Sequence, residues 1–185
     1  MRLRITSGYL KGRFIKVPKS DLIRPTTERV RESLFNILSN KMSFEGIKVL
    51  DLYAGSGALG FECLSRGAGE IHFVESNNLI YRNLEENIAN LQVESFCRIF
   101  KMSALKFSLL KKNTGYDLIL ADPPFFKYDI YNVVENILNN KYLRKDCLMI
   151  IERSVQTKNK DTENFKVEPF KIIGDACLYE ITYSK

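Results

Sequence analysis

The sequence predicts an α/β fold with a doubly wound, mostly parallel sheet, and three observations support this. From Gly46 onward, short β-rich runs alternate with segments of helical spacing. The β-rich runs are nearly all apolar, which is typical of parallel strands covered by helices on both faces. Near the end of the chain, two more β-rich segments flank the turn dipeptide Gly174-Asp175 and predict an antiparallel hairpin at one edge of the sheet. Together these segments predict a sheet of seven strands.

The pattern of apolar residues places each element of this sheet. The parallel strands are expected at residues 47–52, 70–75, 95–102, 116–121 and 147–152. The helices are expected at residues 59–66, 78–91, 104–111 and 131–139. The edge hairpin is expected at residues 165–173 and 176–183. Residues 156–164 are polar and rich in charge, so we expect a mobile loop there.

The N-terminal part of the chain has a pattern of its own. Residues 2–17 alternate between apolar and polar on either side of two glycines, which predicts a small β-hairpin with outward-facing cations. Residues 24–27 (Arg-Pro-Thr-Thr) then end the extended structure and offer a threonine N-cap. The apolar residues that follow recur at helical spacing, at Val30, Leu34, Ile37 and Leu38. We therefore expect a helix of about three turns.

Composition indicates one ordinary domain in a reducing compartment. The chain has 185 residues, 45% of them hydrophobic, which is enough to bury a core without metals or disulfides. The four cysteines lie far apart with no C-x-x-C pair, and His72, the one histidine, lies within an expected strand, where a structural role is favoured. We expect no metal. No signal peptide or membrane span is evident, so a soluble, cytoplasmic protein is expected.

The positive charge of the chain is concentrated at its N-terminus. Residues 1–31 hold nine Lys and Arg against two acids, so this segment has a net charge of +7. The whole chain has a net charge of +6, so the remaining residues sum to −1. A polyanion is the natural partner for such a segment, because cations that neutralise phosphates release counterions and steer association. A basic surface that is merely solvated is the alternative.

A glycine-rich turn follows the first apolar strand of the sheet and opens a helix. Such a turn lies at the carboxyl end of its strand, where α/β proteins bind ligands, and glycine lets the backbone approach the ligand closely. Asp51 and Glu75 lie at successive strand ends, where carboxylates can contact a ligand. However, Gly55, Gly57 and Gly60 also match the G-x-G-x-x-G spacing of dinucleotide-binding proteins, so a nicotinamide enzyme has to be considered.

A second turn carries the sequence Asp122-Pro123-Pro124-Phe125 directly after a later strand. Two successive prolines remove two backbone donors and stiffen the chain, which leaves carbonyl oxygens in fixed directions. An amino group on a nucleic-acid base is a poor nucleophile. A carboxylate and a carbonyl that accept its two protons orient it and favour the charge that develops as it attacks. Phe125 adds a flat face on which a base can stack.

With these motifs in order, the chain resembles the class I SAM-dependent methyltransferases, and among them the RsmD-type rRNA guanine-N2 methyltransferases. The resemblance extends over nearly the whole chain. The residues that carry it are 2–12 (RLRITSGYLKG), 24–35 (RPTTERVRESLF), 50–60 (LDLYAGSGALG), 64–68 (LSRGA), 73–75 (FVE) and 122–125 (DPPF). It implies a Rossmann-like fold in which residues 24–185 form the methyltransferase domain and residues 1–23 a basic N-terminal β-hairpin extension.

The resemblance also implies roles for particular residues. Asp51, Gly55, Gly57 and Glu75 are expected to bind S-adenosylmethionine (SAM), with Glu75 at the ribose hydroxyls. Ser103 stands where many relatives have an acidic or amide residue that holds the adenine. Asp122, Pro123 and Phe125 are expected to hold the target base. The residues expected to face RNA are Arg2, Arg4, Lys11, Arg13, Arg24, Thr26, Arg29 and Arg31.

The resemblance thus implies a methyltransferase that acts on the exocyclic amino group of a guanine in small-subunit (16S) ribosomal RNA. The expected partner is this RNA within a small ribosomal subunit. Other functions stay open at this stage. A DNA or protein amino-methyltransferase would share the fold, and D-P-P-F in place of N-P-P-Y favours guanine without proving it. A nicotinamide-dependent oxidoreductase fits the glycine spacing, and a non-catalytic RNA-binding assembly factor fits the N-terminal charge.

Overall fold

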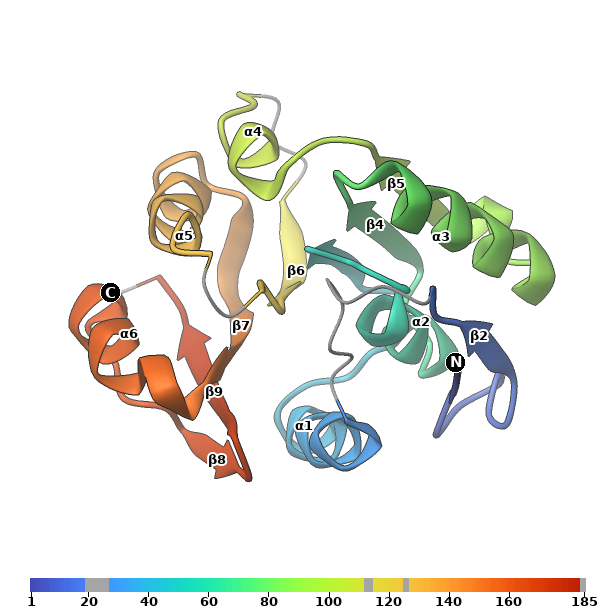
Figure 1. Ribbon diagram of the computed structural model, residues 1–185, viewed down its shortest axis with the longest axis horizontal. Helices are drawn as coiled ribbons and strands as arrows, with labels where there is room; N and C mark the ends of the chain where they lie inside the picture. Colours follow the sequence, from blue (N-terminus) through green and yellow to red (C-terminus); the bar gives the residue numbers. More distant parts are fainter. Residues whose placement is uncertain (19–26, 112–114, 125–126, 184–185) are drawn as a thin grey trace.

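The computed structural model describes residues 1–18, 27–111, 115–124 and 127–183. They form a seven-stranded sheet in the order β5-β4-β3-β6-β7-β9-β8, with a separate two-stranded N-terminal sheet beside it (Figure 1). The strands of the large sheet are β3 (Lys48–Leu52), β4 (Glu70–Val74), β5 (Cys97–Phe100), β6 (Tyr116–Ala121), β7 (Leu143–Ser154), β8 (Lys171–Ile173) and β9 (Ala176–Ile181). The strands from β5 to β7 pair in parallel, and β9 runs antiparallel to both β7 and β8, which confirms the predicted parallel sheet with an antiparallel edge.

Helices cover both faces of this sheet. The apolar cluster on one face includes residues of α1 (Glu28–Lys41), α2 (Ala58–Ser65) and α3 (Asn78–Leu91). The cluster on the other face includes residues of α4 (Ala104–Ser108), α5 (Ile130–Asn139) and α6 (Lys158–Phe165). Two short 3-10 helices, η1 (Glu94–Phe96) and η2 (Val155–Thr157), complete the elements. None of the helices in the described ranges has the length and apolar character needed to cross a membrane.

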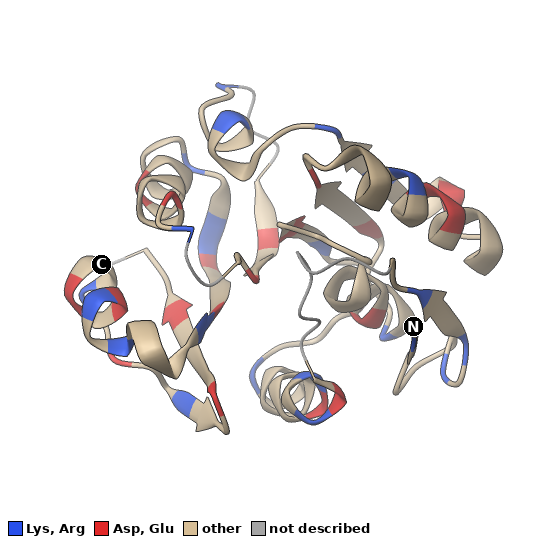
Figure 2. Cartoon of the chain, viewed as in Figure 1, with Lys and Arg blue, Asp and Glu red and all other residues tan. Residues whose placement is uncertain are grey.

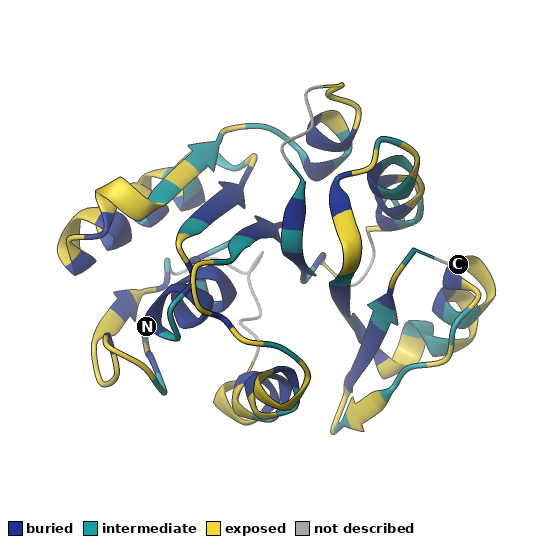
Figure 3. Cartoon of the chain, turned by 180° about the vertical axis from the view of Figure 1, so that it is seen from behind, coloured by how far each residue is buried: buried dark blue, intermediate teal, exposed yellow. Residues whose placement is uncertain are grey.

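The strand sequences explain this three-layer arrangement. Neighbouring residues of a strand point to opposite faces, so Val49 packs in the first cluster and Leu50 in the second. Both side chains have no exposed surface, and Figure 3 shows the same burial along the central strands. Burying such a side chain stabilises the fold by roughly 1.5–3 kcal/mol as an upper estimate. This burial on both faces explains why most positions along these strands are apolar, as the sequence indicates.

The N-terminal residues form the predicted hairpin, from β1 (Arg2–Arg4) and β2 (Phe14–Lys16). It is fixed against α2 by a carboxylate that has no exposed surface. Glu62 accepts hydrogen bonds from the Thr6 amide at 2.9 Å, the Thr6 hydroxyl at 2.6 Å and the Ser7 amide at 3.1 Å. At Gly8, any Cβ would lie 1.6 Å from the carbonyl oxygen of Ser65, so only glycine allows this approach. The hairpin is therefore held in one place on the core.

Helix α1 confirms the predicted threonine cap, since the Thr27 side chain accepts a hydrogen bond from the Val30 amide. The helix has 14 residues, one turn more than expected. Its buried stripe contains Leu34, Phe35 and Leu38. Arg24 and Thr26 lie outside the described residues.

The prediction of a mobile loop at residues 156–164 is wrong, because η2 and α6 occupy this segment. A buried carboxylate holds it in place. Asp161 has no exposed surface and accepts hydrogen bonds from Arg153 Nε at 3.1 Å, the Tyr131 hydroxyl at 2.7 Å and the Thr157 hydroxyl at 2.6 Å. The expected strand at 165–173 is also too long, since Phe165 ends α6 and β8 begins only at Lys171.

His72 has the structural role expected of it. Its Nδ1 lies 2.8 Å from the Tyr116 hydroxyl and its Nε2 lies 2.6 Å from Glu70 Oε1. Burial lowers the pKa of His72, so the ring is neutral at pH 7. The imidazole therefore serves as a hydrogen-bonded bridge between β4 and β6.

Replacing Asp161 by alanine is expected to lower the free energy of unfolding by about 3–5 kcal/mol, because the substitution removes the carboxylate that balances the buried charge of Arg153. Urea unfolding followed by circular dichroism measures the change. Glu163→Ala is the control, since Glu163 is exposed on the same helix and should change stability by less than about 0.5 kcal/mol. Equal effects of the two substitutions would show that Asp161 does not anchor α6.

Candidate active site at the strand ends

Three neighbouring strands end at the same level and bring their following turns together. Leu52 at the end of β3 is paired with Val74 of β4 on one side and with Ala121 of β6 on the other. The chain proceeds outward from β3 to β4 and β5, and then returns to the other side of β3 with β6. The sheet order therefore reverses between β3 and β6, and open α/β sheets bind ligands at this switch point.

In the glycine-rich turn after β3, Gly55 has the least crowded surroundings of the three glycines. Its φ is +56°, and among the described residues a Cβ there would meet the Tyr53 carbonyl oxygen alone, at 3.9 Å. At Gly57 a Cβ would lie 2.5 Å from the Phe61 ring, and at Gly60 it would lie 2.3 Å from the Phe73 ring. Close packing thus explains the glycines at 57 and 60. Gly55 presents bare backbone to the space at the strand ends, as a close-bound ligand requires.

Asp51 lies beneath this turn as a buried carboxyl group. It is 2% exposed and accepts a hydrogen bond from the Gly60 amide at 2.9 Å. Burial raises the pKa of Asp51 well above its usual value, and the charges of Asp122 and Glu75 raise the pKa further. Glu75 and Asp122 directly follow β4 and β6, which pair with β3 on either side of it, so the three acids predicted for the site stand at the same edge of the sheet.

Glu75 fixes the turn from the end of β4. Its Oε2 accepts a hydrogen bond from the Gly55 amide at 3.1 Å, and its Oε1 accepts one from the Asn77 amide at 2.7 Å. Each carboxylate oxygen has a second lone pair, so both can still accept a hydroxyl group of a ligand. The expected contact with ribose hydroxyls is compatible with this geometry.

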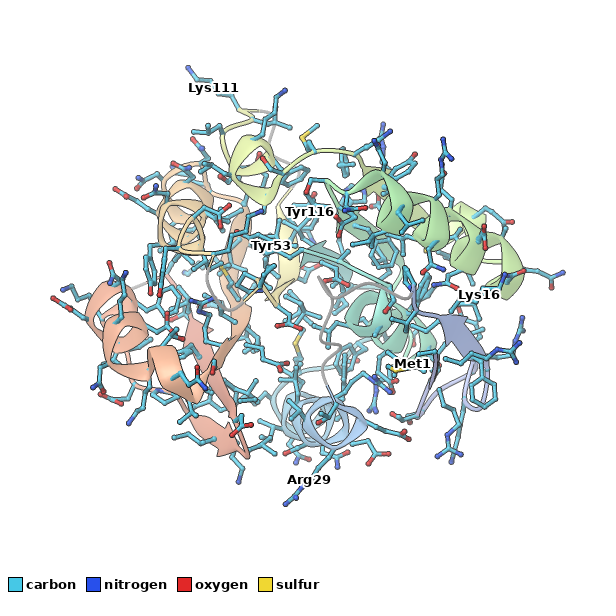
Figure 4. All side chains as sticks on the ribbon, viewed as in Figure 1. Met1, Lys16, Arg29, Tyr53, Lys111 and Tyr116 are labelled. Carbon is cyan, nitrogen blue, oxygen red and sulfur yellow. The ribbon has the colours of Figure 1, made fainter. Side chains whose placement is uncertain are left out.

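Tyr53 joins the turn after β3 to the segment after β6. Its φ is +59°, which is rare for a residue other than glycine, and its hydroxyl donates a hydrogen bond to Asp129 Oδ1 at 3.1 Å. Burial and the Asp129 carboxylate raise the pKa of Tyr53, so the hydroxyl stays protonated. Figure 4 shows Tyr53 near the middle of the molecule. No sequence pattern points to this contact, because Asp129 lies 76 residues from Tyr53 along the chain.

The predicted base-binding turn begins directly after β6. Asp122 is partly exposed there and Pro123 is buried. Asp122 follows Ala121, which pairs with Leu52, so it lies beside the glycine-rich turn. Phe125 lies outside the described residues, and its expected role stays a prediction.

Ser103 lies just beyond the end of β5 and caps α4. Its Oγ accepts a hydrogen bond from the Lys106 amide at 3.2 Å. One lone pair is therefore already used, which leaves the hydroxyl a weak acceptor for an adenine amino group. Its expected cofactor contact stays a prediction.

The residues expected to face RNA divide into two groups. Those exposed on the surface are Arg2, Arg4, Lys11, Arg13 and Arg29. Figure 2 shows basic segments along the hairpin, and Figure 4 shows Arg29 projecting away from α1. The expectation that Arg31 faces RNA is wrong, since Arg31 is only 1% exposed. The sequence contained the signal, because Arg31, Leu34, Phe35 and Leu38 share one helix face.

Arg31 instead connects α1 to the N-terminal hairpin. Its Nη2 donates a hydrogen bond to the Arg4 carbonyl at 2.8 Å, and its Nε lies 3.9 Å from Glu62. Burial lowers the pKa of Arg31, while the charge of Glu62 raises it. An arginine in this position supports the surface from which Arg4 projects and does not itself reach a ligand.

Among the described residues, no three His, Cys, Asp or Glu side chains gather as they would around a metal ion.

Asn87 of α3 is a further buried polar residue near the site, and no sequence motif points to it. It is 1% exposed and both ends of its side-chain amide are hydrogen-bonded. Its Oδ1 accepts a hydrogen bond from the Lys16 amide at 2.8 Å, and its Nδ2 donates to the Lys16 carbonyl at 2.9 Å and to the Ser56 carbonyl at 3.1 Å. This amide therefore connects the hairpin with the glycine-rich turn.

The raised pKa of Asp51 predicts a dependence of stability on pH. The unfolded chain ionises Asp51 near its ordinary pKa of 3.8, whereas the folded protein keeps the proton to higher pH. Between the two pKa values the unfolded state binds fewer protons, so this group lowers the free energy of unfolding by up to about 1.4 kcal/mol per pH unit as pH rises. Asp51→Asn does not titrate and can still accept from Gly60, so it should gain stability relative to the wild type.

Urea unfolding of the ligand-free wild type and Asp51→Asn at several pH values between about 4 and 8 measures this difference. Glu135→Gln is the control, because Glu135 is exposed on α5. A constant difference between wild type and Asp51→Asn across this range would contradict the burial of an unfavourably placed carboxyl group.

Comparison with known proteins identifies the family. The family model described as Conserved hypothetical protein 95 matches residues 3–182. Ribosomal RNA small subunit methyltransferase D of Escherichia coli is 35% identical over 155 residues, covering 84% of this chain and 76% of the relative. The protein of the same name from Buchnera aphidicola (Acyrthosiphon pisum) is 32% identical over 178 residues, covering 96% and 92%. The solved structure of yhhF from Escherichia coli superimposes with a TM-score of 0.82 at 28% identity, with both chains fully covered.

The relatives are methyltransferases on the same Rossmann-like fold, and this favours methyl transfer over the nicotinamide-dependent reaction that the glycine spacing left open. The acids at the strand ends agree with that activity. The chain therefore belongs to the Conserved hypothetical protein 95 family, the family of ribosomal RNA small subunit methyltransferase D, and is a methyltransferase.

Proposed function

We propose that this methyltransferase transfers the methyl group of SAM to the exocyclic amino group of a guanine in small-subunit (16S) ribosomal RNA. One observation carries the proposal, namely the gathering of Asp51, Glu75 and Asp122 around an open glycine-rich turn at adjoining strand ends. The names of the relatives support ribosomal RNA as the substrate. An assembled small subunit is the proposed context of that RNA.

The methyltransferase family and its fold imply a SAM-type donor, and the residues present fit one. When bound, SAM supplies an electrophilic methyl group on a positively charged sulfonium. Asp51, Gly55, Gly57 and Glu75 would hold it, with Ser103 proposed at the adenine. Burial raises the pKa of Asp51 and the charges of Asp122 and Glu75 raise it further, so a positively charged ligand would be favoured beside these two carboxylates. Glu75 has lone pairs left for two ribose hydroxyls.

The turn after β6 is proposed to hold the target base. The Asp122 carboxylate and a carbonyl of the following proline segment would accept the two amino protons of guanine. These contacts would orient the nitrogen lone pair and stabilise the positive charge that develops on the nitrogen as the methyl group passes to it from sulfur, leaving a neutral thioether. The Asp122 carboxylate would then take the proton that the nitrogen loses. Phe125 would stack on the base, which has to be unpaired to enter the site. The enzyme then contributes mainly through position.

The RNA itself is proposed to lie across the basic N-terminal region. Arg2, Arg4, Lys11 and Arg13 project from the hairpin, and Arg29 projects from α1. Exposed cations of this kind contact phosphates and position the RNA without reading its sequence. Arg24 and Thr26 are proposed for the same surface.

Substitution of Asp122 tests the proposal. Asp122→Ala should lower kcat by about 10²–10³-fold at saturating SAM and RNA, because one of the acceptors for the amino group is lost. Asp122→Asn keeps one acceptor oxygen and should fall between this variant and the wild type. The assay measures transfer of tritium from labelled SAM to small ribosomal subunits, with mass spectrometry identifying N2-methylguanosine in the RNA.

Glu135→Ala, which removes an exposed carboxylate of α5, is the control and should keep wild-type kcat. Offering DNA and release factors in place of small subunits tests the alternative amino-methyltransferases. A wild-type rate for Asp122→Ala would refute the role given to this carboxylate, and label in DNA or protein alone would refute the RNA substrate.

A further inference from the structure

The outward face of the N-terminal hairpin combines an aromatic ring with three cations. Arg2 pairs with Lys16 across the two strands, and Arg4 pairs with Phe14. All four side chains are exposed, whereas Ile15 between them is 2% exposed and packs on the core. Phe14 is 56% exposed, so its ring contributes little to the core. Figure 4 shows Lys16 on this hairpin beside α3.

A single exposed apolar side chain is common and by itself means nothing. This one differs in its surroundings, because the strands that carry it are fixed. The buried Arg31 side chain donates a hydrogen bond to the Arg4 carbonyl. Asn87 forms hydrogen bonds with both the amide and the carbonyl of Lys16. The face is therefore arranged before any ligand arrives, which reduces the entropy lost on binding.

We propose that this face binds single-stranded RNA, with Phe14 stacked on an unpaired base and with Arg2, Arg4 and Lys16 on the flanking phosphates. The inference rests on the proposed function and deepens it. An aromatic ring among cations is the arrangement with which proteins bind single strands, because every base offers a flat face and every linkage a negative charge. A duplex keeps its bases stacked and offers Phe14 no face.

The ion pairs already present on this face do not prevent such binding. Arg4 lies 3.3 Å from Glu28, and Lys16 lies 3.2 Å from Glu86. The side chains in both pairs are about half exposed, and pairs of this kind contribute little to stability. Both cations can therefore turn to a phosphate at small cost.

The bound strand would lie at a fixed position relative to the active site. Asn87 holds the main chain of Lys16 and the carbonyl of Ser56 with the same side chain, and Ser56 lies between Gly55 and Gly57 in the proposed donor turn. Phe14 and Lys16 are two residues apart on one strand face, about 7 Å. A base stacked on Phe14 is thereby placed relative to the methyl donor.

Fluorescence anisotropy with a short fluorescein-labelled RNA of mixed sequence tests this inference. The single strand should bind the wild type more tightly than the same RNA annealed to its complement. Phe14→Ala should weaken single-strand binding about tenfold and abolish this preference, while Phe14→Tyr, which keeps a flat ring, should bind within about threefold of the wild type. Ile172→Ala, which truncates an exposed apolar side chain of β8 at the other end of the sheet, should bind as the wild type does.

The salt dependence separates stacking from charge. Arg4→Gln should reduce the slope of log K against log salt concentration by roughly 0.7, and Phe14→Ala should leave the slope unchanged. Wild-type affinity of Phe14→Ala, or equal binding of single strand and duplex by the wild type, would overturn the inference. Because the assay needs no methyl transfer, a wild type that binds in this way but does not methylate ribosomal RNA would refute only the proposed function.

Discussion

The parallel pairing of β3 with β6 is the constraint on which the rest of the site depends. It places Leu52 opposite Ala121, so the turns that follow these residues begin side by side although they lie about 70 residues apart in the sequence. Neither turn contains a complete site. The first supplies open backbone at Gly55 above a buried acid, and the second supplies Asp122 and a rigid proline segment. The two turns lie side by side because a crossover through β4 and β5 separates β3 and β6 in sequence and not in space.

Buried polar side chains then attach the basic hairpin to this site. Glu62 accepts hydrogen bonds from Thr6, Ser7 and Arg66. Asn87 accepts one from the Lys16 amide and donates one to the Ser56 carbonyl, and both Glu62 and Asn87 are almost fully buried. Such contacts are expensive to leave unsatisfied, so they define one position of the hairpin more strictly than apolar packing would. The surface proposed to bind RNA is thereby held at a fixed position relative to the turn proposed to bind the donor.

The sequence was sufficient where local pattern determines structure. The predicted bounds of α3 and β6 agree with the structure, because apolar spacing and burial coincide there. It was insufficient where a distant partner decides the outcome. Residues 156–164 form η2 and most of α6 because Asp161 meets Arg153 and Tyr131 in the interior. Arg31 is buried because Glu62 lies opposite it, and Tyr53 finds Asp129 only once β3 and β6 are paired. Within the site, the acids were predictable from their positions at strand ends, whereas the polar side chains that support them were not.

The same site works against the stability of the fold. Asp51, Glu75 and Asp122 stand where three neighbouring strands end. The pKa of Asp51 is raised by burial and by the other two carboxylates, so its ionisation is unfavourable in the ligand-free protein. A structure selected only for stability would have an apolar residue or an amide at this position. Retaining a carboxyl group makes sense if a cation relieves the repulsion when it binds, because part of the binding free energy then comes from strain already present in the folded state. The cluster of acids thus favours a positively charged donor over a neutral or anionic one, which the glycine turn alone cannot distinguish.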